Sequence, residues 1–341
     1  MISPSPSGLF CEAGGFHIDP WRPVERAVIT HAHSDHASAG SRSYLCAAPG
    51  ERVLRRRLPD AHVETLPYGD TIAIGDTRVS FHPAGHILGS AQVRVEHRGD
   101  VWVVSGDYKC QPDPTCEPFE TVRCRTFITE ATFALPIYTW DPAAGVVDEI
   151  LEWWRLNRAA GRPSVVFCYV LGKAQRILAE LRSRADGPIH LHGAMAALTD
   201  AYRESGIAMA PAERITEDMR GKALAQSLVL APLSARGTVW MRRLPNASVS
   251  FASGLMRVRG VRRQRAFDRG FVLSDHADWM GLLSSIDATG AERVLVTHGW
   301  SDALARHLHE TRGIETGTIR TAFEGEAGEL SGSDDPGEPA P

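Results

Sequence analysis

Short runs of alternating apolar and polar residues dominate the first third of the chain. Residues 77–84 (TRVSFHPA) and 89–97 (GSAQVRVEH) alternate polar and apolar, and a turn at residues 98–100 leads into the apolar run at 101–107 (VWVVSGD). Alternation with a period of two is typical of half-buried strands, and a short apolar run bounded by turn residues is typical of a buried strand. This part of the chain therefore predicts a mostly antiparallel sheet.

The pattern changes after the strand expected at residues 125–131. Apolar strands now alternate with amphipathic helices, which predicts βαβ units and a parallel sheet. The expected elements are a helix at 144–160, a strand at 163–170, a helix from Gly172, a strand at 188–192, a helix from Ala194, and strands at 227–233 and 246–253. Strands at 270–274 and 293–299, a helix near 279–288 and a last helix follow. The layout predicts a sheet-rich lobe that is interrupted by an α/β insertion and then completed.

Length and composition fit an ordinary globular protein of two lobes, because domains usually run to about 100 to 200 residues and this chain has 341. The first ten residues, MISPSPSGLF, carry no basic segment followed by an apolar one, and no run of about 18 apolar residues occurs. A signal peptide and a membrane span are therefore not expected. The six cysteines form no C-x-x-C pair, which favours free thiols and a cytoplasmic protein. The tail from Glu324, with six acids and no base, is expected to be disordered.

The net charge of −4 conceals an uneven distribution. Residues 140–265 hold 19 Lys or Arg and 11 Asp or Glu, and residues 236–265 hold eight arginines and no acid. A run of basic residues is often only a solvated surface. Guanidinium groups, however, match phosphate oxygens, and a run without acids offers them no internal partners. The insertion therefore favours a polyanionic substrate.

The stretch THAHSDHA, residues 30–37, places four metal-binding side chains within six positions: His31, His33, Asp35 and His36. A single histidine is usually an ordinary core or surface residue. Four such residues in a loop that leaves a strand are typical of a metal site, and imidazole with carboxylate favours zinc or a similar ion over calcium.

Three more metal-binding residues follow or precede apolar strands elsewhere in the chain. His86 lies in a glycine-flanked turn, Asp107 lies just past the apolar residues 101–104, and His298 lies just past the apolar residues 294–296. Side chains at strand ends can reach a common pocket, so we expect one site with two metal ions. His82 is the alternative to His86 as the ligand. The flanking residues GH and GS favour His86.

Several of these segments together resemble a known family. FHIDPW around Asp19, HAHSDH, GHILGSA and SGD resemble the metallo-β-lactamase fold, whose pattern is H-x-H-x-D-H with a later His and Asp. LGKAQRIL, LSDHADW and VTHGW resemble the β-CASP branch of that fold, nucleases of RNA processing and DNA repair. The stretch from SGLMRVRGVRRQRAFDRGF to LSDHADWMGLL, with GDYKCQPDPTCEPFE, is most similar to bacterial DNA-ligase-associated exonucleases. The resemblance covers residues 8–323.

The resemblance implies an α/β protein, a metallo-β-lactamase αββα sandwich with an inserted β-CASP α/β domain. It places the first part of the sandwich at residues 1–139, the insertion at 140–265, the second part at 266–323 and the acidic tail at 324–341. It also implies two divalent metal ions, zinc or manganese. The implied ligands are His31, His33 and His86 for one ion, Asp35, His36 and His298 for the other, and Asp107 bridging the two.

Other residues carry supporting roles in the same resemblance. Asp19 would orient a ligand histidine, and Glu130 with His276 would form the acid that protonates the leaving oxygen. Asp275, beside His276 in LSDH, is not expected to bind metal. The residues expected to contact substrate phosphates are Lys173 at a helix start and Arg257, Arg259, Arg262 and Arg263 in the arginine-rich run.

The implied function is a metal-dependent DNA exonuclease, with Asp35, Glu130 and His276 as catalytic residues. It would act in DNA repair beside a DNA ligase and a helicase, with DNA preferred over RNA and no membrane involved. An RNA-processing ribonuclease is the alternative, because RNA-processing members also carry a histidine at the position of His298. A non-catalytic nucleic-acid-binding scaffold would have lost ligands, whereas every expected position is filled. A small-molecule hydrolase would lack the basic insertion.

Overall fold

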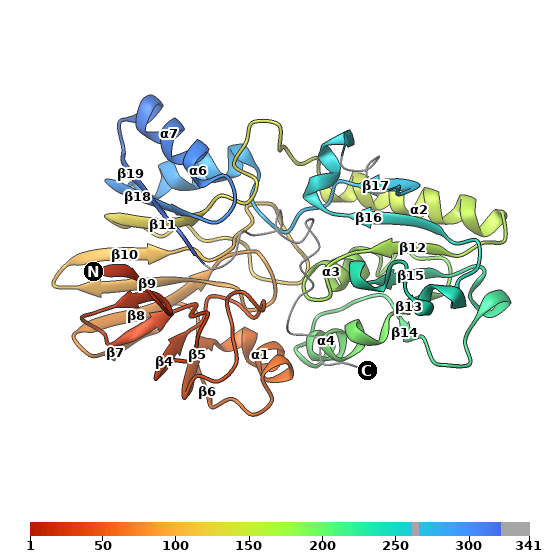
Figure 1. Ribbon diagram of the computed structural model, residues 1–341, viewed down its shortest axis with the longest axis horizontal. Helices are drawn as coiled ribbons and strands as arrows, with labels where there is room; N and C mark the ends of the chain where they lie inside the picture. The colour runs from red at the N-terminus through yellow and green to blue at the C-terminus, as the bar shows by residue number, and fades with distance from the viewer. Residues whose placement is uncertain (261–265, 322–341) are drawn as a thin grey trace. The chain divides into compact units, whose positions relative to one another are not determined.

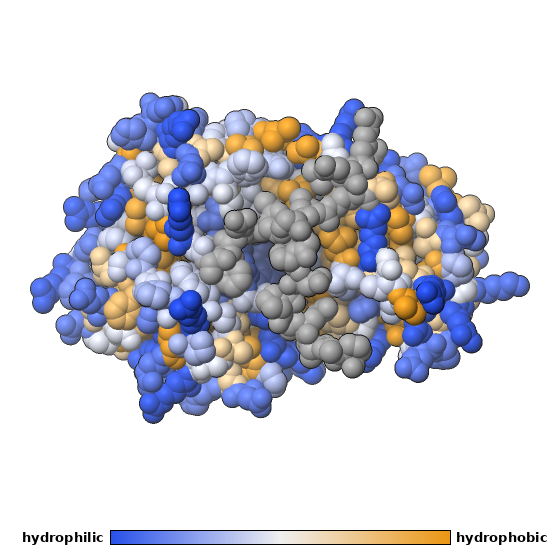
Figure 2. Space-filling model, in the orientation of Figure 1, coloured by the Kyte–Doolittle hydropathy of each residue, from blue (hydrophilic) through white to orange (hydrophobic). Residues whose placement is uncertain are grey.

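The computed structural model describes residues 1–260 and 266–321 and divides the chain into two compact units. The first consists of residues 1–138 and the residues from 276 onward, and the second of residues 139–275. Each is described by itself. In the view of Figure 2 the surface is mostly hydrophilic, with apolar side chains scattered over it. No helix among the described residues is long and apolar enough to cross a bilayer.

Two sheets form the first unit (Figure 1). The six-stranded sheet has the order β1 (Ile2–Ser5), β2 (Gly8–Cys11), β3 (Phe16–Ile18), β4 (Arg26–Val28), β5 (Ser43–Ala47) and β6 (Val63–Leu66). The seven-stranded sheet has the order β19 (Glu315–Ile319), β18 (Arg293–Thr297), β11 (Thr126–Glu130), β10 (Asp100–Val104), β9 (Ala91–His97), β8 (Thr77–Pro83) and β7 (Thr71–Ile74). The antiparallel expectation is confirmed for β7 to β10, whereas β3 to β6 pair in parallel.

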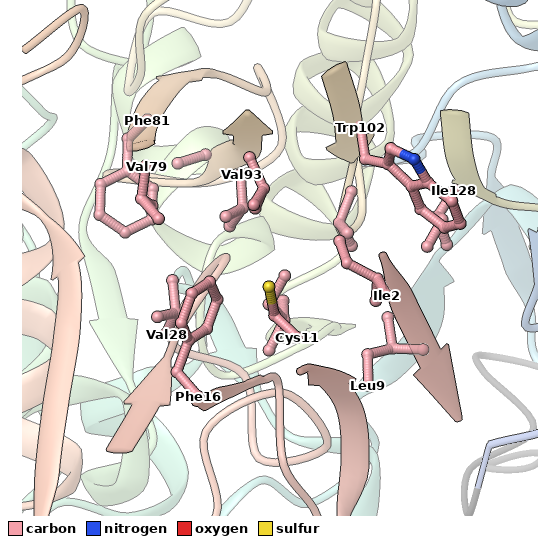
Figure 3. Packing of buried hydrophobic residues seen from close by; sticks show 14 of the residues in the cluster. Ile2, Leu9, Cys11, Phe16, Val28, Val79, Phe81, Val93, Trp102 and Ile128 are labelled. Carbon is pink, nitrogen blue, oxygen red and sulfur yellow. The ribbon is translucent and has the colours of Figure 1, made fainter. Parts of the chain in front are cut away.

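The alternation of side chains along the strands separates two cores in this unit. Inward-facing residues of the two sheets meet in one apolar cluster, with Phe16 and Val28 on one side and Phe81 and Val93 on the other (Figure 3). Val103, whose neighbours in β10 face that cluster, belongs instead to a second one. Helices α6 (Trp279–Thr289) and α7 (Ser301–Arg312) cover this second cluster. On the six-stranded sheet, the short helix α1 (Glu51–Arg57) lies beside β6. The unit is an αββα sandwich.

A parallel six-stranded sheet forms the second unit, as the alternation of strands and helices predicts. Its order is β14 (Glu213–Arg214), β13 (Ile189–Leu191), β15 (Leu228–Ala231), β12 (Ser164–Phe167), β16 (Ser248–Ala252) and β17 (Arg269–Phe271). The helices are α2 (Ala143–Ala159), α3 (Lys173–Glu180) and α4 (Gly193–Glu204), all of which bury apolar residues in the same cluster as β12, β13 and β15. The short 3₁₀ turns of this unit are η2 (Gly221–Leu224), η3 (Leu233–Ala235), η4 (Val239–Arg243) and η5 (Gly254–Arg257), and η1 (Ala48–Gly50) precedes α1 in the first unit.

The end of the inserted unit lies at residue 275 rather than at the expected residue 265. The reason is β17, which pairs in parallel with β16 and so extends the sheet of the insertion. The expected disordered tail at 324–341 lies outside the described residues.

A buried ion cluster closes the second unit at its C-terminal boundary. Lys173 Nζ lies 2.9 Å from Asp275 Oδ2, and Arg176 Nη1 lies 3.1 Å from Asp275 Oδ1 and 2.6 Å from the carbonyl oxygen of Ser274. Lys173 and Arg176 are almost completely inaccessible to solvent. Buried charges of this kind are stable only when each has its partner, because removal of one leaves the other without compensation.

We therefore expect Lys173→Met to lower the free energy of unfolding by about 3 kcal/mol or more. Urea unfolding followed by circular dichroism measures this. Lys222, an exposed residue of the same unit, is the matched control, and Lys222→Met should change the stability by less than about 0.5 kcal/mol. Equal midpoints for both variants would show that the buried cluster contributes nothing to stability.

Candidate metal centre

The loop after β4 folds back on itself and brings its histidines together. The backbone amides of His36 and Ala37 both donate to the carbonyl oxygen of His33, at 3.2 and 2.9 Å. Arg57 of α1 donates from Nη1 to the carbonyl oxygen of Ala32 at 2.7 Å, which ties the loop to the helix. The expected clustering of side chains in residues 31–36 follows from this tight turn.

Three imidazoles and one carboxylate converge in a first group. His31 Nε2 and His86 Nε2 lie 3.0 and 3.1 Å from His33 Nδ1, and Asp107 Oδ2 lies 3.6 Å from His31 Nε2. One donor atom from each of these four residues falls within 4.8 Å of the others. His31, His86 and Asp107 are buried. Nitrogen and oxygen donors that face a common point are the donor set of a zinc-type site.

A second group shares Asp107 with the first. His36 Nε2 lies 3.4 Å from Asp107 Oδ2 and 3.5 Å from Asp35 Oδ2, and His298 Nδ1 lies 4.0 Å from Asp107 Oδ1. One donor atom each of His36, Asp107 and His298 falls within 4.8 Å of the others. Asp107 thus lies between the two groups, the position that a bridging ligand requires. His82 lies apart from them and pairs with Glu120 at 3.0 Å.

Two observations indicate that the groups fit divalent ions. His36 Nε2 and Asp107 Oδ1 are buried and have no hydrogen-bond partner among the described residues, although buried polar atoms are normally satisfied. Burial and then the nearby histidines hold the pKa of His31 well below its ordinary value, so that its ring is neutral. Burial would raise the pKa of Asp107, but His36 and other histidines hold it well below the usual range. Neutral imidazole and ionised carboxylate are the forms that bind metal.

The surroundings of His36 favour a positive charge at this place. Burial would lower the pKa of His36, but Asp35, Asp107 and Asp19 together raise it well above the ordinary value. Burial, and then His36, lowers the pKa of His298. A cation held among these carboxylates would compensate their charge in the same way as a proton.

Asp19 fixes the orientation of His36. Its Oδ2 lies 2.7 Å from His36 Nδ1, and its two oxygens accept from the amide and hydroxyl of Thr30 at 2.8 and 2.6 Å. A carboxylate that accepts from Nδ1–H leaves Nε2 unprotonated and directed toward the donors of the second group. The sequence pattern does not predict a role for Thr30, because that role depends on its contact with Asp19, eleven positions away.

We expect Asp19→Asn to weaken binding of the ion held by His36 by about 10- to 100-fold. Competition with a chromophoric chelator measures the affinity for each added Zn²⁺. Asp76, which is exposed on a turn between β7 and β8, gives the control Asp76→Asn, with affinity unchanged. Wild-type affinity in Asp19→Asn would contradict the orienting role.

Backbone strain coincides with this centre. Asp19 and His298 have φ values of 45° and 58°, in the left-handed region that residues other than glycine rarely adopt. Gly299 has φ of 59°, and a Cβ there would lie 2.4 Å from the carbonyl oxygen of Ala131. Such strain persists where the surrounding structure imposes it, and it is concentrated at functional sites.

A buried acid and histidine lie beside the first group. Glu130 ends β11, and its carboxylate lies 2.9 and 3.0 Å from His276 Nδ1 and accepts from the amide of Tyr108 at 2.8 Å. The ring centroids of His276 and His86 are 4.7 Å apart. The pair expected from the sequence is therefore assembled next to a histidine of the first group.

The residues expected to contact substrate belong to the second unit and differ in their surroundings. Lys173 is fully buried in its ion pair with Asp275, so its side chain is not available to a phosphate and that expectation needs correction. Arg257 pairs with Asp141 at 3.2 Å, and Arg259 is exposed. Arg262 and Arg263 lie outside the described residues.

Comparison with known proteins agrees with this geometry. No protein-family model matches the chain. A protein named "Probable DNA ligase" from Opitutus terrae is 34% identical over 317 residues, 92% of this chain and 30% of that protein. Ribonuclease TTHA0252 from Thermus thermophilus is 26% identical over 217 residues, 53% of this chain and 49% of that protein. The chain thus spans less than half of the length of either relative.

A solved structure supports the architecture over most of the chain. A protein of unknown function from Enterococcus faecalis V583 has a TM-score of 0.57 at 14% identity, covering 88% of this chain and 80% of that one. The fold is that of the metallo-β-lactamases, an αββα sandwich with an α/β insertion. The chain belongs to the β-CASP branch of that fold, as its motifs indicate.

Proposed function

We propose that this protein is a metal-dependent nuclease that hydrolyses phosphodiester bonds of DNA from a strand end. The observation that carries the proposal is the pair of donor groups joined at Asp107, with the Glu130–His276 pair beside them. Phosphodiester hydrolysis requires an activated water, neutralisation of the phosphate charge and a proton for the leaving oxygen. The site has residues suited to each of these needs.

His31, His33 and His86 would hold one divalent ion, Asp35, His36 and His298 the other, and Asp107 both. When bound, two such ions supply a nucleophilic water at neutral pH and offset the charge of the phosphate. The electrostatic demand on the protein is then to keep its carboxylates ionised and its imidazoles neutral. The lowered pKa values of Asp107 and His31 meet this demand. Nearby carboxylates raise the pKa of His36 instead, and there the ion would take the place of the proton.

His276 is suited to donate the proton to the leaving sugar oxygen. Glu130 accepts from its Nδ1, which leaves Nε2 as the nitrogen that delivers a proton. An imidazole with an ordinary pKa of about 6.5 can both hold and release a proton near neutral pH. The neighbouring carboxylate stabilises the charged ring and fixes its orientation. Glu130 is therefore a positioning residue in this reaction.

DNA as substrate is supported by the ligase-associated resemblance and by the relative named as a DNA ligase, of which this chain matches under a third. That match also supports a role beside a ligase in DNA repair. An RNA substrate is the second candidate, supported by the relative named as a ribonuclease. The net positive charge of residues 140–265 suits either polymer.

End-labelled oligonucleotides test the proposal. Single-stranded DNA and RNA of matched sequence, labelled separately at the 5′ and the 3′ end, are incubated with the protein and Mn²⁺ or Zn²⁺. We expect mononucleotides from one DNA end, and no product with Asp35→Ala or His276→Ala. Cleavage of RNA but not of DNA would show that the protein is a ribonuclease. No cleavage of either polymer would refute the proposal.

A further inference from the structure

The structure separates the arginines of the inserted unit into those with partners and those without. Arg236 lies over the ring of a phenylalanine, Arg243 donates to two backbone carbonyl oxygens, and Arg257 pairs with a carboxylate. Arg214 and Arg242 are exposed, and neither forms an ion pair with any residue that the structure describes. These two guanidinium groups are therefore available to an anion from solution.

A histidine lies close to Arg214 and to a partly exposed tryptophan. The ring centroids of Trp240 and His192 are 4.7 Å apart, with the planes at 62°. Arg214 lies against Gly193, because a Cβ on that glycine would be 3.3 Å from two of the guanidinium nitrogens. Val239, beside Trp240 in the chain, is 68% exposed. The indole thus lies in a surface patch with a cation nearby.

The position of this patch in the fold is that of a ligand site. His192 directly follows β13, Arg214 ends β14, and Trp240 belongs to η4, which follows β15. All three strands are parallel, so their carboxyl ends lie at one edge of the sheet. Ligands of open α/β sheets bind outside the carboxyl ends of the strands.

The aromatic and cationic side chains of the patch suit an unpaired segment of nucleic acid. An exposed aromatic ring stacks on unpaired nucleobases of any sequence, and unpaired arginines bind the phosphates that connect them. The carboxylate next to Arg214, that of Glu213, precedes it in the same strand and so projects to the opposite face. A base in a duplex is already stacked and paired, and cannot lie on the indole without being unpaired first.

We propose that His192, Arg214 and Trp240 form a platform that binds an unpaired nucleobase and its adjoining phosphates. This inference rests on the proposed function and specifies its substrate as a single strand. The platform contains none of the residues proposed to hold the ions or to donate the proton, so its loss weakens binding without removing the catalytic residues.

Fluorescence anisotropy with a labelled single-stranded DNA, in the presence of a chelator to prevent cleavage, tests the platform on the full-length chain. We expect Trp240→Ala to raise Kd about tenfold or more, because stacking contributes roughly 1–3 kcal/mol per base. Trp240→Phe should retain most of the affinity, which separates stacking from misfolding. Arg214→Ala should also weaken binding and reduce its dependence on salt. Duplex DNA should bind more weakly than the single strand and respond little to Trp240→Ala.

Arg182, an exposed arginine after α3 without an ion pair among the described residues, gives the matched control Arg182→Ala, with Kd close to wild type. Unchanged Kd in both Trp240→Ala and Arg214→Ala would refute the platform. If wild-type protein still cleaves DNA in that case, the proposed nuclease function stands. If the wild type neither binds nor cleaves nucleic acid, both proposals fail together.

Discussion

Asp107→Asn is expected to reduce the rate of DNA cleavage by more than about 100-fold. This loss is larger than the one expected when a residue that only orients a metal ligand is changed. Asp107 Oδ2 lies within 3.4 to 3.9 Å of nitrogens of His31, His36 and His86, so its charge serves both donor groups. Asparagine has nearly the same size but no charge. The initial rate on single-stranded DNA, with metal content measured on the same sample, gives the result.

The matched control for this substitution is Asp70→Asn, on an exposed turn of the same unit. It should leave both the rate and the metal content unchanged. Wild-type cleavage by Asp107→Asn would show that the two groups are not coupled through this carboxylate, and the proposed arrangement of the centre would be wrong.

His276→Ala is expected to lower the rate on DNA by about 10²- to 10⁴-fold, the usual contribution of a general acid. Asp107, Glu130 and His276 also place one donor atom each within 4.8 Å of one another. The metal content should nevertheless be unchanged, because Glu130 holds His276 through Nδ1 and the two ions would have their ligands in the other two groups. With a p-nitrophenyl phosphodiester the loss should shrink to less than about tenfold, since nitrophenolate departs without being protonated. Steady-state rates on the two substrates provide the comparison.

Glu130→Gln should also lower the rate on DNA, but by less than His276→Ala. It leaves the imidazole of His276 in place and removes the negative charge that stabilises the protonated ring. His309→Ala, on the exposed side of α7, is the control. An equal loss on DNA and on the nitrophenyl ester would mean that His276 acts through the structure of the site rather than as an acid.

Much of the fold could be predicted because its signals are local. The period-two alternation in β8 and β9 is visible in the sequence, and so is the change to alternating strands and helices that marks the insertion. The order of the strands was not accessible in this way. Strand β17 looks like part of the second stretch of the sandwich, yet its partner β16 assigns it to the insertion. Pairing between strands depends on tertiary contacts that a local pattern does not contain.

The same distinction applies to the site. His31 to His36 are adjacent in the sequence, and His86, Asp107 and His298 were predicted because each lies at the end of an apolar strand. The structure brings the histidines and Asp107 into two adjoining groups, and Asp35 Oδ2 lies 3.5 Å from His36 Nε2. The burial of Lys173 was not predictable, because its partner Asp275 is about 100 residues away and the start of a helix suggests an exposed side chain.

A stoichiometric metal titration shows whether the active protein holds two metal ions. Protein freed of metal by chelation is supplied with Mn²⁺ in steps, and DNA cleavage is measured after each addition at a protein concentration well above Kd for the metal. We expect activity to rise to a break at two equivalents per chain. Full activity at one equivalent, or cleavage independent of metal, would contradict this expectation.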